Sequence, residues 1–161
     1  MRFPLLFALA ALLFSASAPA QTIILVRHAE RVDAGGAAES DPKLSIAGEA
    51  RAQALAQTLR DARIHAIYAT EFQRTQATAK PLADLLKIPV TIVRASDTAA
   101  LVEALKTAKE NALVVGHSNS LPEIMKALGI DDPPKLGEND YDHLFLLRLT
   151  PQPEFLTLHF R

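Results

Sequence analysis

Two arginines and two histidines stand where they could bind and transfer a phosphoryl group. Arg27 and His28 directly follow one apolar run of the sequence, His117 directly follows another, and Arg74 lies shortly after a third. A neutral imidazole is a nucleophile, and guanidinium groups hold a phosphate through paired N–H donors. Nearby guanidinium groups also lower the pKa of an imidazole, which keeps it neutral. These residue types therefore indicate phosphoryl-transfer chemistry with His28 as the nucleophile.

The elements that must position these residues follow from the apolar pattern. Short runs rich in β-branched residues predict strands over 22–27, 64–69, 89–94 and 112–116. Helical spacing predicts a helix over 46–60 and further helices that end near residues 86, 109 and 128. This alternation predicts an α/β fold, a three-layer α/β/α sandwich with a mostly parallel sheet. Strands over 144–149 and 155–160 predict a hairpin that makes the C-terminal edge antiparallel.

The helix starts and strand ends together predict a phosphate pocket. The predicted caps are Ser45 and Thr98 as single N-caps, and Thr70–Gln73 and Ser120–Glu123 as capping boxes. In open α/β sheets the ligand site lies outside the carboxyl ends of the strands, and helix N-termini there favour anions. Because the Arg27–His28 pair, Arg74 and His117 all come at such ends, we expect them to converge. The loop over 131–140 is expected to lie above the pocket.

Four ordered segments carry a resemblance to a known family. They are LVRHAER (25–31), LSIAGEARA (44–52), YATEFQRTQATA (68–79) and VVGHSNSLPEIMKALG (114–129). In these segments the sequence resembles the histidine phosphatase superfamily, the phosphoglycerate-mutase-like group, whose hallmark is an Arg-His pair directly after the first strand. The resemblance covers nearly the whole chain after residue 20, and the short length is similar to that of small bacterial members.

The resemblance implies a mechanism and the residues that perform it. His28 would attack phosphorus in line and become phosphohistidine, which water would then hydrolyse. Arg27, Arg74 and His117 would surround the phosphoryl group. The implied activity is that of a phosphomonoesterase without a metal ion or other cofactor. Its partner would be a small phosphorylated substrate or a phosphoprotein.

Two departures from the family pattern affect what is carried over. Ala29 stands where the family often has glycine after the Arg-His pair. Larger members also supply a glutamate that protonates the leaving group, and this sequence has no obvious equivalent. Asp97 and Glu30 are the candidates for that general acid. Ser118 and Asn119, which follow His117, are candidates for phosphate or substrate binding.

The first 20 residues have the order of a secretory signal peptide. A positive charge at Arg2 precedes an apolar run from Leu5 to Phe14, and small residues precede an expected cleavage after Ala20. This predicts export, in a bacterium to the periplasm. The apolar run is too short to span a bilayer, so no stable membrane insertion is expected after cleavage.

Residues 21–161 would form a single domain. The net charge of -1 gives no sign of a nucleic-acid partner.

The same residues leave one alternative open and disfavour several others. A catalytically weak protein of the same fold that binds phosphate or a phospholigand remains possible, because the general acid is unassigned. A mutase is disfavoured by the short chain. A zinc site of His28, Glu30 and His117 lacks the helical metal-binding spacing, and the arginines would repel a cation. A serine hydrolase is disfavoured because GHSNS lacks the Gly-x-Ser-x-Gly pattern.

The remaining charged and aromatic residues have simpler interpretations. Arg51 is expected to form a structural ion pair and not to take part in catalysis. His65 and His159 are expected to be structural residues of strands. Three residues near the expected fifth strand are candidates for the pocket rim: Glu138, Tyr141 and His143.

Overall fold

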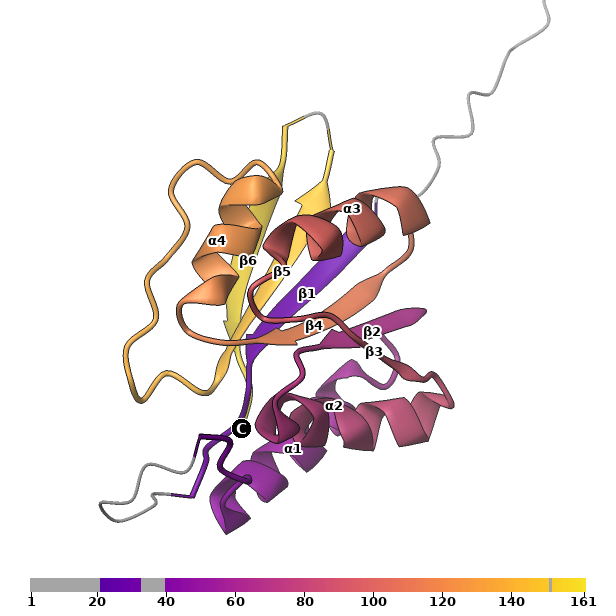
Figure 1. Cartoon of the computed structure of the whole chain (residues 1–161). Coiled ribbons are helices and arrows are strands. Elements are labelled where there is room, and N and C mark those ends of the chain that lie inside the picture. Colours follow the sequence, from indigo (N-terminus) through magenta and orange to yellow (C-terminus); the bar gives the residue numbers. More distant parts are fainter. Residues whose placement is uncertain (1–20, 33–39, 151) are drawn as a thin grey trace, which may run out of the picture.

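A six-stranded sheet stands at the centre of the computed structural model, which describes residues 21–32, 40–150 and 152–161. The strands are β1 (Gln21–Arg27), β2 (Ala66–Ala69), β3 (Val90–Ile92), β4 (Ala112–Gly116), β5 (His143–Leu149) and β6 (Glu154–His159). They lie in the order β3-β2-β4-β1-β5-β6 (Figure 1). The first four are mutually parallel, whereas β5 is antiparallel to both β1 and β6. The predicted mixed sheet with an antiparallel C-terminal edge is confirmed.

Two expectations concern residues that the structure does not describe in full. The expected signal peptide, residues 1–20, lies outside the described residues. Residues 33–39, between the expected strand over 22–27 and the expected helix over 46–60, also lie outside them. Among the residues that are described, no helix has both the length and the apolar character that a membrane crossing requires.

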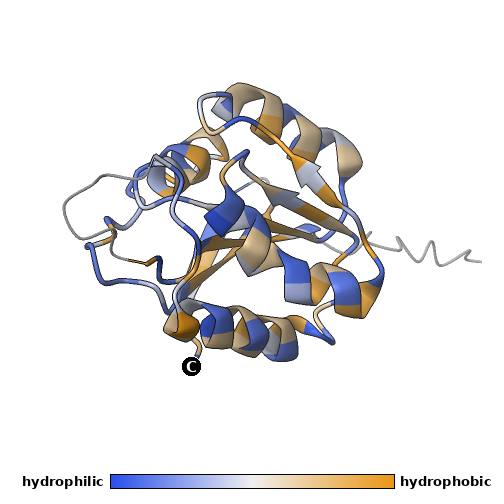
Figure 2. Ribbon diagram, turned by 60° about the horizontal axis from the view of Figure 1, so that its bottom comes forward, coloured by the Kyte–Doolittle hydropathy of each residue, from blue (hydrophilic) through white to orange (hydrophobic). Residues whose placement is uncertain are grey.

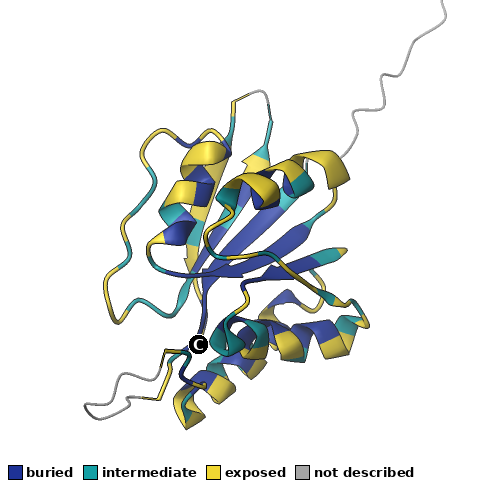
Figure 3. Ribbon diagram, in the orientation of Figure 1, coloured by how far each residue is buried: buried dark blue, intermediate teal, exposed yellow. Residues whose placement is uncertain are grey.

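Helices cover both faces of the sheet. The helices α1 (Ile46–Leu59) and α2 (Gln73–Leu86) lie on one face, and α3 (Thr98–Ala108) and α4 (Ser120–Ala127) lie on the other (Figure 1). The outward surfaces of these helices are exposed and largely hydrophilic, whereas the central strands are buried (Figures 2 and 3). The three-layer α/β/α sandwich is therefore confirmed.

The central strand β1 contributes to the core on both faces, because successive side chains of a strand point to opposite sides. Ile23 and Leu25 belong to the apolar cluster on the α3 and α4 side, and Ile24 and Val26 belong to the cluster on the α1 and α2 side. All four are at most 2% exposed. This packing fixes the end of β1, which carries Arg27 and His28.

The start of α1 agrees with the predicted cap and rests on a close backbone approach. Ser45 is the N-cap, and its Oγ accepts a hydrogen bond from the Gly48 N–H at 3.1 Å. The Ser45 N–H donates to the Glu30 carbonyl oxygen at 2.9 Å. A methyl group at Gly48 would overlap that same carbonyl oxygen, so only glycine fits there. The LSIAGEARA segment therefore anchors α1 to the chain just after His28.

The other three predicted caps are wrong. At α2 the cap comes from a distant carboxylate, since Asp41 accepts from the Gln73 N–H at 3.0 Å. At α3 the N-cap is Asp97 and not Thr98. At α4 the Ser120 Oγ accepts from the His117 N–H at 3.0 Å, and no side-chain bond caps the helix.

Candidate active site

The predicted site residues converge at the carboxyl ends of β1, β2 and β4. They line a polar cavity of about 730 Å³. Its lining includes Arg27, His28, Phe72, Arg74, His117, Ser118, Asn119, Glu138 and Tyr141. A second cavity of about 620 Å³ is lined by residues of α1, α2 and the segment before α1, and it includes none of the four predicted catalytic residues. The polar cavity at the sheet edge is therefore the candidate active site.

His28 is buried and held in one tautomer. It is 4% exposed, and its backbone N–H donates to the Gly116 carbonyl oxygen of β4 at 2.9 Å. Its Nδ1 lies 2.8 Å from the Ala29 carbonyl oxygen. A carbonyl oxygen can only accept, so this contact assigns the proton to Nδ1. The Nε2 atom therefore keeps its lone pair, as a nucleophile requires.

The surroundings of His28 also keep the imidazole neutral. Burial is the largest cause that lowers its pKa from 6.5 to about 4, and the charges of His117, Arg74 and Arg27 lower it further. The hydrogen bond to Ala29 acts in the opposite direction and is outweighed. The sequence predicted the effect of the guanidinium groups but not the larger effect of burial, because it does not report exposure.

His117 lies beside His28 and is anchored by a hydroxyl chain. The two rings meet edge to face, with their centroids 5.4 Å apart. His117 Nε2 lies 3.0 Å from Thr70 Oγ1, which in turn lies 2.9 Å from Thr75 Oγ1. Burial, and then the charge of Arg74, lowers the pKa of His117 to about 4. His117 is therefore neutral near pH 7 and would contribute a hydrogen bond and not a charge.

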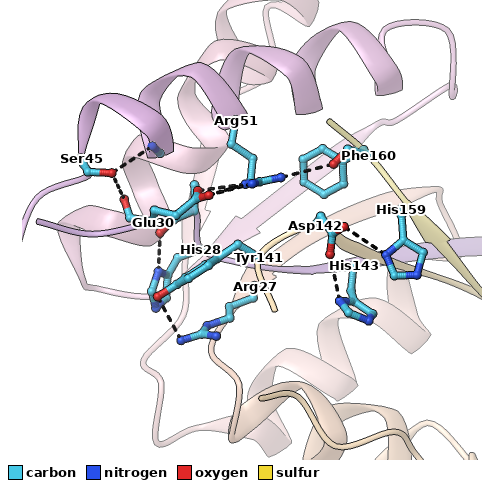
Figure 4. Close-up of polar contacts among 12 residues, drawn as sticks. Arg27, His28, Glu30, Ser45, Arg51, Tyr141, Asp142, His143, His159 and Phe160 are labelled. Atoms are coloured by element: carbon cyan, nitrogen blue, oxygen red, sulfur yellow. Dashed lines mark hydrogen bonds and ion pairs between the residues drawn. The ribbon is translucent and has the colours of Figure 1, made fainter. Parts of the chain in front are cut away.

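Arg27 reaches from the end of β1 into the loop before β5. Its Nη1 donates to the carbonyl oxygens of Gly137 and Glu138 at 2.9 and 2.8 Å. Its guanidinium carbon lies 4.2 Å from the centre of the Tyr141 ring (Figure 4). The Nε atom is buried and has no hydrogen-bond partner among the described residues. The loop thus orients the guanidinium group and leaves its Nε donor for a ligand.

Arg74 lies in the first turn of α2, and its guanidinium group, like that of Arg27, is held by neighbouring groups. Its Nη1 pairs with Asp41 Oδ1 at 3.3 Å, and its guanidinium group stacks on Phe72 at 4.3 Å. Its Nε is likewise buried without a partner in the described part of the chain. An unsatisfied buried donor costs about 1–3 kcal/mol, so an anion that accepts from both Nε atoms would be stabilised. The cavity is therefore suited to an oxyanion.

The comparisons agree with this geometry. The family model described as "Histidine phosphatase superfamily (branch 1)" matches residues 23–97, which include Arg27, His28 and Arg74. Over these residues the chain is similar to the histidine phosphatase superfamily. His117 lies beyond the matched segment, and the structure brings it to the site. No curated protein matches the chain.

Solved structures of phosphatases share the fold. The protein histidine phosphatase SixA, complexed with tungstate, has a TM-score of 0.67 at 17% identity, covering 86% of this chain and 97% of SixA. Mycobacterial glucosyl-3-phosphoglycerate phosphatase has a TM-score of 0.68 at 14% identity, covering 87% of this chain and 98% of the other. The same mycobacterial enzyme complexed with VO3 has a TM-score of 0.68 at 14% identity, with 86% and 97% covered.

The two candidates for the general acid, Glu30 and Asp97, are both engaged by other groups. Glu30 is held by Arg51, with Oε1 2.7 Å from Nη2 and both oxygens 2.9 Å from Nε (Figure 4). Partial burial raises the pKa of Glu30, but the hydrogen bonds from Arg51 and from its own backbone N–H, together with the charges of Arg51 and Arg27, outweigh burial, so the pKa is lowered. Asp97 is exposed, accepts from the Ala100 N–H at 3.0 Å and does not line the cavity. The expected ion pair of Arg51 is confirmed.

Most of the other residues predicted to lie near the site line the cavity. Ser118, Asn119, Glu138 and Tyr141 line the cavity, whereas His143 does not. Sequence reasoning missed Asp41, which both caps α2 and pairs with Arg74. No local signal marks Asp41, because its partners lie more than 30 residues away and only the fold brings them together.

Lowering the pH will destabilise the fold through His28 and His117. Both imidazoles have pKa values of about 4 in the folded protein, against 6.5 for an unperturbed histidine. The unfolded chain therefore binds more protons between pH 6.5 and 4. Since each pKa unit corresponds to about 1.4 kcal/mol, the free energy of unfolding will fall by about 3 kcal/mol per imidazole across this interval. Urea unfolding at a series of pH values measures it.

Substitutions test whether these two histidines cause the pH dependence of the free energy of unfolding. His28→Gln and His117→Gln will each reduce the dependence of unfolding free energy on pH. His65→Gln, at an exposed position before β2, will leave it unchanged. A double variant of His28 and His117 with the full wild-type pH dependence would contradict the assignment.

Proposed function

We propose that the protein is a phosphomonoesterase that hydrolyses a phosphate ester through a phosphohistidine intermediate on His28. The observation that carries this proposal is a buried, neutral imidazole whose Nδ1 proton is held by Ala29. It shares the cavity with two arginines that each keep one buried N–H without a partner among the described residues. These features support a nucleophile and a phosphate clamp that are arranged before any ligand binds.

The proposed reaction has two displacements. His28 Nε2 attacks phosphorus, the N–P bond forms, and the bond from phosphorus to the leaving oxygen breaks. Arg27 and Arg74 hold the non-bridging oxygens, and His117 donates a hydrogen bond to the same group. Water then attacks phosphorus from the vacated side. The N–P bond breaks, and His28 returns as a neutral imidazole with inorganic phosphate as the product.

The cavity favours substrates whose leaving group needs little protonation. Among the described residues that line it, the carboxylates are Glu30, which Arg51 holds, and Glu138, on an exposed loop. A positioned general acid contributes about 10²–10⁴-fold to a rate. Without one, esters of weakly acidic alcohols will react slowly, whereas aryl phosphates and other substrates with acidic leaving groups will react faster.

The substrate class and the compartment are also proposals. The similar structures are named for a protein histidine phosphatase and for a phosphatase of glucosyl-3-phosphoglycerate, so both a phosphoprotein and a small phosphorylated molecule fit the fold. We place the activity outside the cytoplasm, in the periplasm of a bacterium, because residues 1–20 have the pattern of a signal peptide.

A phosphate-binding protein of the same fold with weak turnover is the second candidate. Its support is the same missing proton donor, because a cavity that binds an oxyanion does not need one. The two candidates differ in turnover with a substrate that needs no protonation. An aryl phosphate is therefore the substrate that separates them.

The decisive assay uses the tag-free chain from residue 21 to residue 161. We expect p-nitrophenyl phosphate to be hydrolysed at least about 100-fold faster than glycerol phosphate, because only the alkyl ester needs a general acid. Vanadate should inhibit, and EDTA should not. Asp97→Asn, a control that keeps the helix cap, should leave both rates unchanged.

Two results would contradict the proposal. If no phosphoester of a broad panel were hydrolysed while inorganic phosphate still bound, the binding-protein candidate would be preferred. If EDTA abolished turnover and zinc restored it, a metal-bound hydroxide and not His28 would be the nucleophile.

A further inference from the structure

A second cluster of titratable side chains, one carboxylate and two imidazoles, lies at the base of the C-terminal hairpin. Asp142 directly precedes β5, and His143 and His159 are cross-strand partners on β5 and β6 (Figure 4). Directly paired residues of an antiparallel sheet carry their side chains on the same face. Their imidazole centroids lie 4.4 Å apart. None of the three residues lines the catalytic cavity.

The atoms of this cluster have distances close to those of a metal site. His143 Nδ1 lies 3.3 Å from Asp142 Oδ1, and His159 Nδ1 lies 3.2 Å from Asp142 Oδ2. Ligand atoms around a tetrahedral zinc ion with bonds of 2.0–2.1 Å lie about 3.3 Å apart. One ligand atom from each residue lies within 4.8 Å of the other two.

A buried nitrogen in the cluster lacks a partner. His143 Nδ1 is buried, yet it makes no hydrogen bond within the described part of the chain, even though the Asp142 carboxylate is close. Leaving a buried polar atom unsatisfied costs about 1–3 kcal/mol in general. A cation placed among the three side chains would give this nitrogen a partner and would also be attracted by the carboxylate.

We propose that Asp142, His143 and His159 bind a divalent transition-metal ion, with zinc as the best match. Two imidazoles and one carboxylate suit zinc, copper or nickel, whereas magnesium and calcium prefer oxygen ligands throughout. The side chains of Asp142 and His159 are 30% and 55% exposed, so water can complete the coordination. The proposal does not rest on the phosphatase activity.

The surroundings of the cluster do not oppose a cation. The nearby positive charge is Arg51, whose guanidinium group interacts with Asp142 but is held by the Glu30 carboxylate. The Asp142 carbonyl oxygen accepts from the Phe160 N–H at 3.0 Å, so the backbone of the site is fixed without the metal. A bound ion would join the start of β5 to the end of β6 and stabilise the hairpin.

Calorimetric titration of the tag-free chain with zinc chloride tests this site. We expect one equivalent of zinc to bind at neutral pH, and magnesium chloride to give no signal. His143→Ala and His159→Ala should each weaken zinc binding by about 10-fold or more, because even loss of an outer hydrogen bond to a ligand costs about 10–100-fold. His65→Ala, an exposed control, should bind as the wild type does.

Two further measurements keep the result unambiguous. Zinc at 100-fold excess over its Kd should raise Tm by about 5–10 °C in the wild type and not in His159→Ala, whose own fold is checked by circular dichroism. His28→Ala should retain zinc binding, which separates this site from the catalytic cavity. No zinc binding to the wild type, or equal binding by His143→Ala and His159→Ala, would overturn the proposal, and so would loss of binding in His28→Ala.

Discussion

Replacing His28 with alanine will lower the turnover of p-nitrophenyl phosphate by about 10⁴-fold or more. Residues that act directly on the reacting bond have effects of this size. In this structure His28 supplies the unprotonated Nε2, because its Nδ1 proton is committed to the Ala29 carbonyl oxygen at 2.8 Å. No neighbouring group in the described cavity offers the same combination, since His117 is engaged through Nε2 by Thr70.

The covalent intermediate gives a second readout of the same substitution. Rapid quenching of the wild type with a ³²P-labelled aryl phosphate should trap a protein-bound label that is stable in base and labile in acid, as expected for phosphohistidine. His28→Ala should trap none, while His65→Ala should label as the wild type does. A label that persists in His28→Ala, or that survives acid, would show that a different residue is the nucleophile.

The main site could be predicted from the sequence because its residues lie at the carboxyl ends of parallel strands. Arg27 is the last residue of β1, and His28 and His117 directly follow buried strands. A parallel sheet brings the carboxyl ends of such strands together. The buried positions of Leu25 and Val26 in β1 are equally visible as an apolar run. Local sequence therefore determines where these side chains emerge, and no long-range information is needed to place them at one edge.

The capping interactions and the general acid were harder to predict, because they depend on competition between partners. Thr70 has the spacing of a cap, but its hydroxyl is close to Thr75 and to His117, and only the fold brings His117 near. Glu30 lies two residues after His28 in the sequence, yet Arg51 on α1 binds its carboxylate. A side chain with several chemically suitable partners cannot be assigned from spacing alone.

Replacing Arg74 with alanine will lower kcat/KM for an aryl phosphate by about 10²–10³-fold, the usual effect of removing one preorganised donor to a developing oxyanion. Arg74 is held between Asp41 at 3.3 Å and the Phe72 ring at 4.3 Å, so its orientation is set before substrate binds. Its charge also helps to lower the pKa of His28, which would rise in the variant. Steady-state kinetics across a pH series measures both effects.

A conservative replacement distinguishes charge from geometry at this position. Arg74→Lys keeps the positive charge but lacks the planar fork and the Nε donor, so its kcat/KM should lie between those of the wild type and Arg74→Ala. Vanadate inhibition should weaken in the same order, because the same donors would hold the oxyanion. Arg60→Ala, at an exposed arginine just after α1, should leave both unchanged. Wild-type kcat/KM in a folded Arg74→Ala would mean that Arg27 alone binds the phosphoryl group, and the pairing of the two guanidinium groups would then have no role in catalysis.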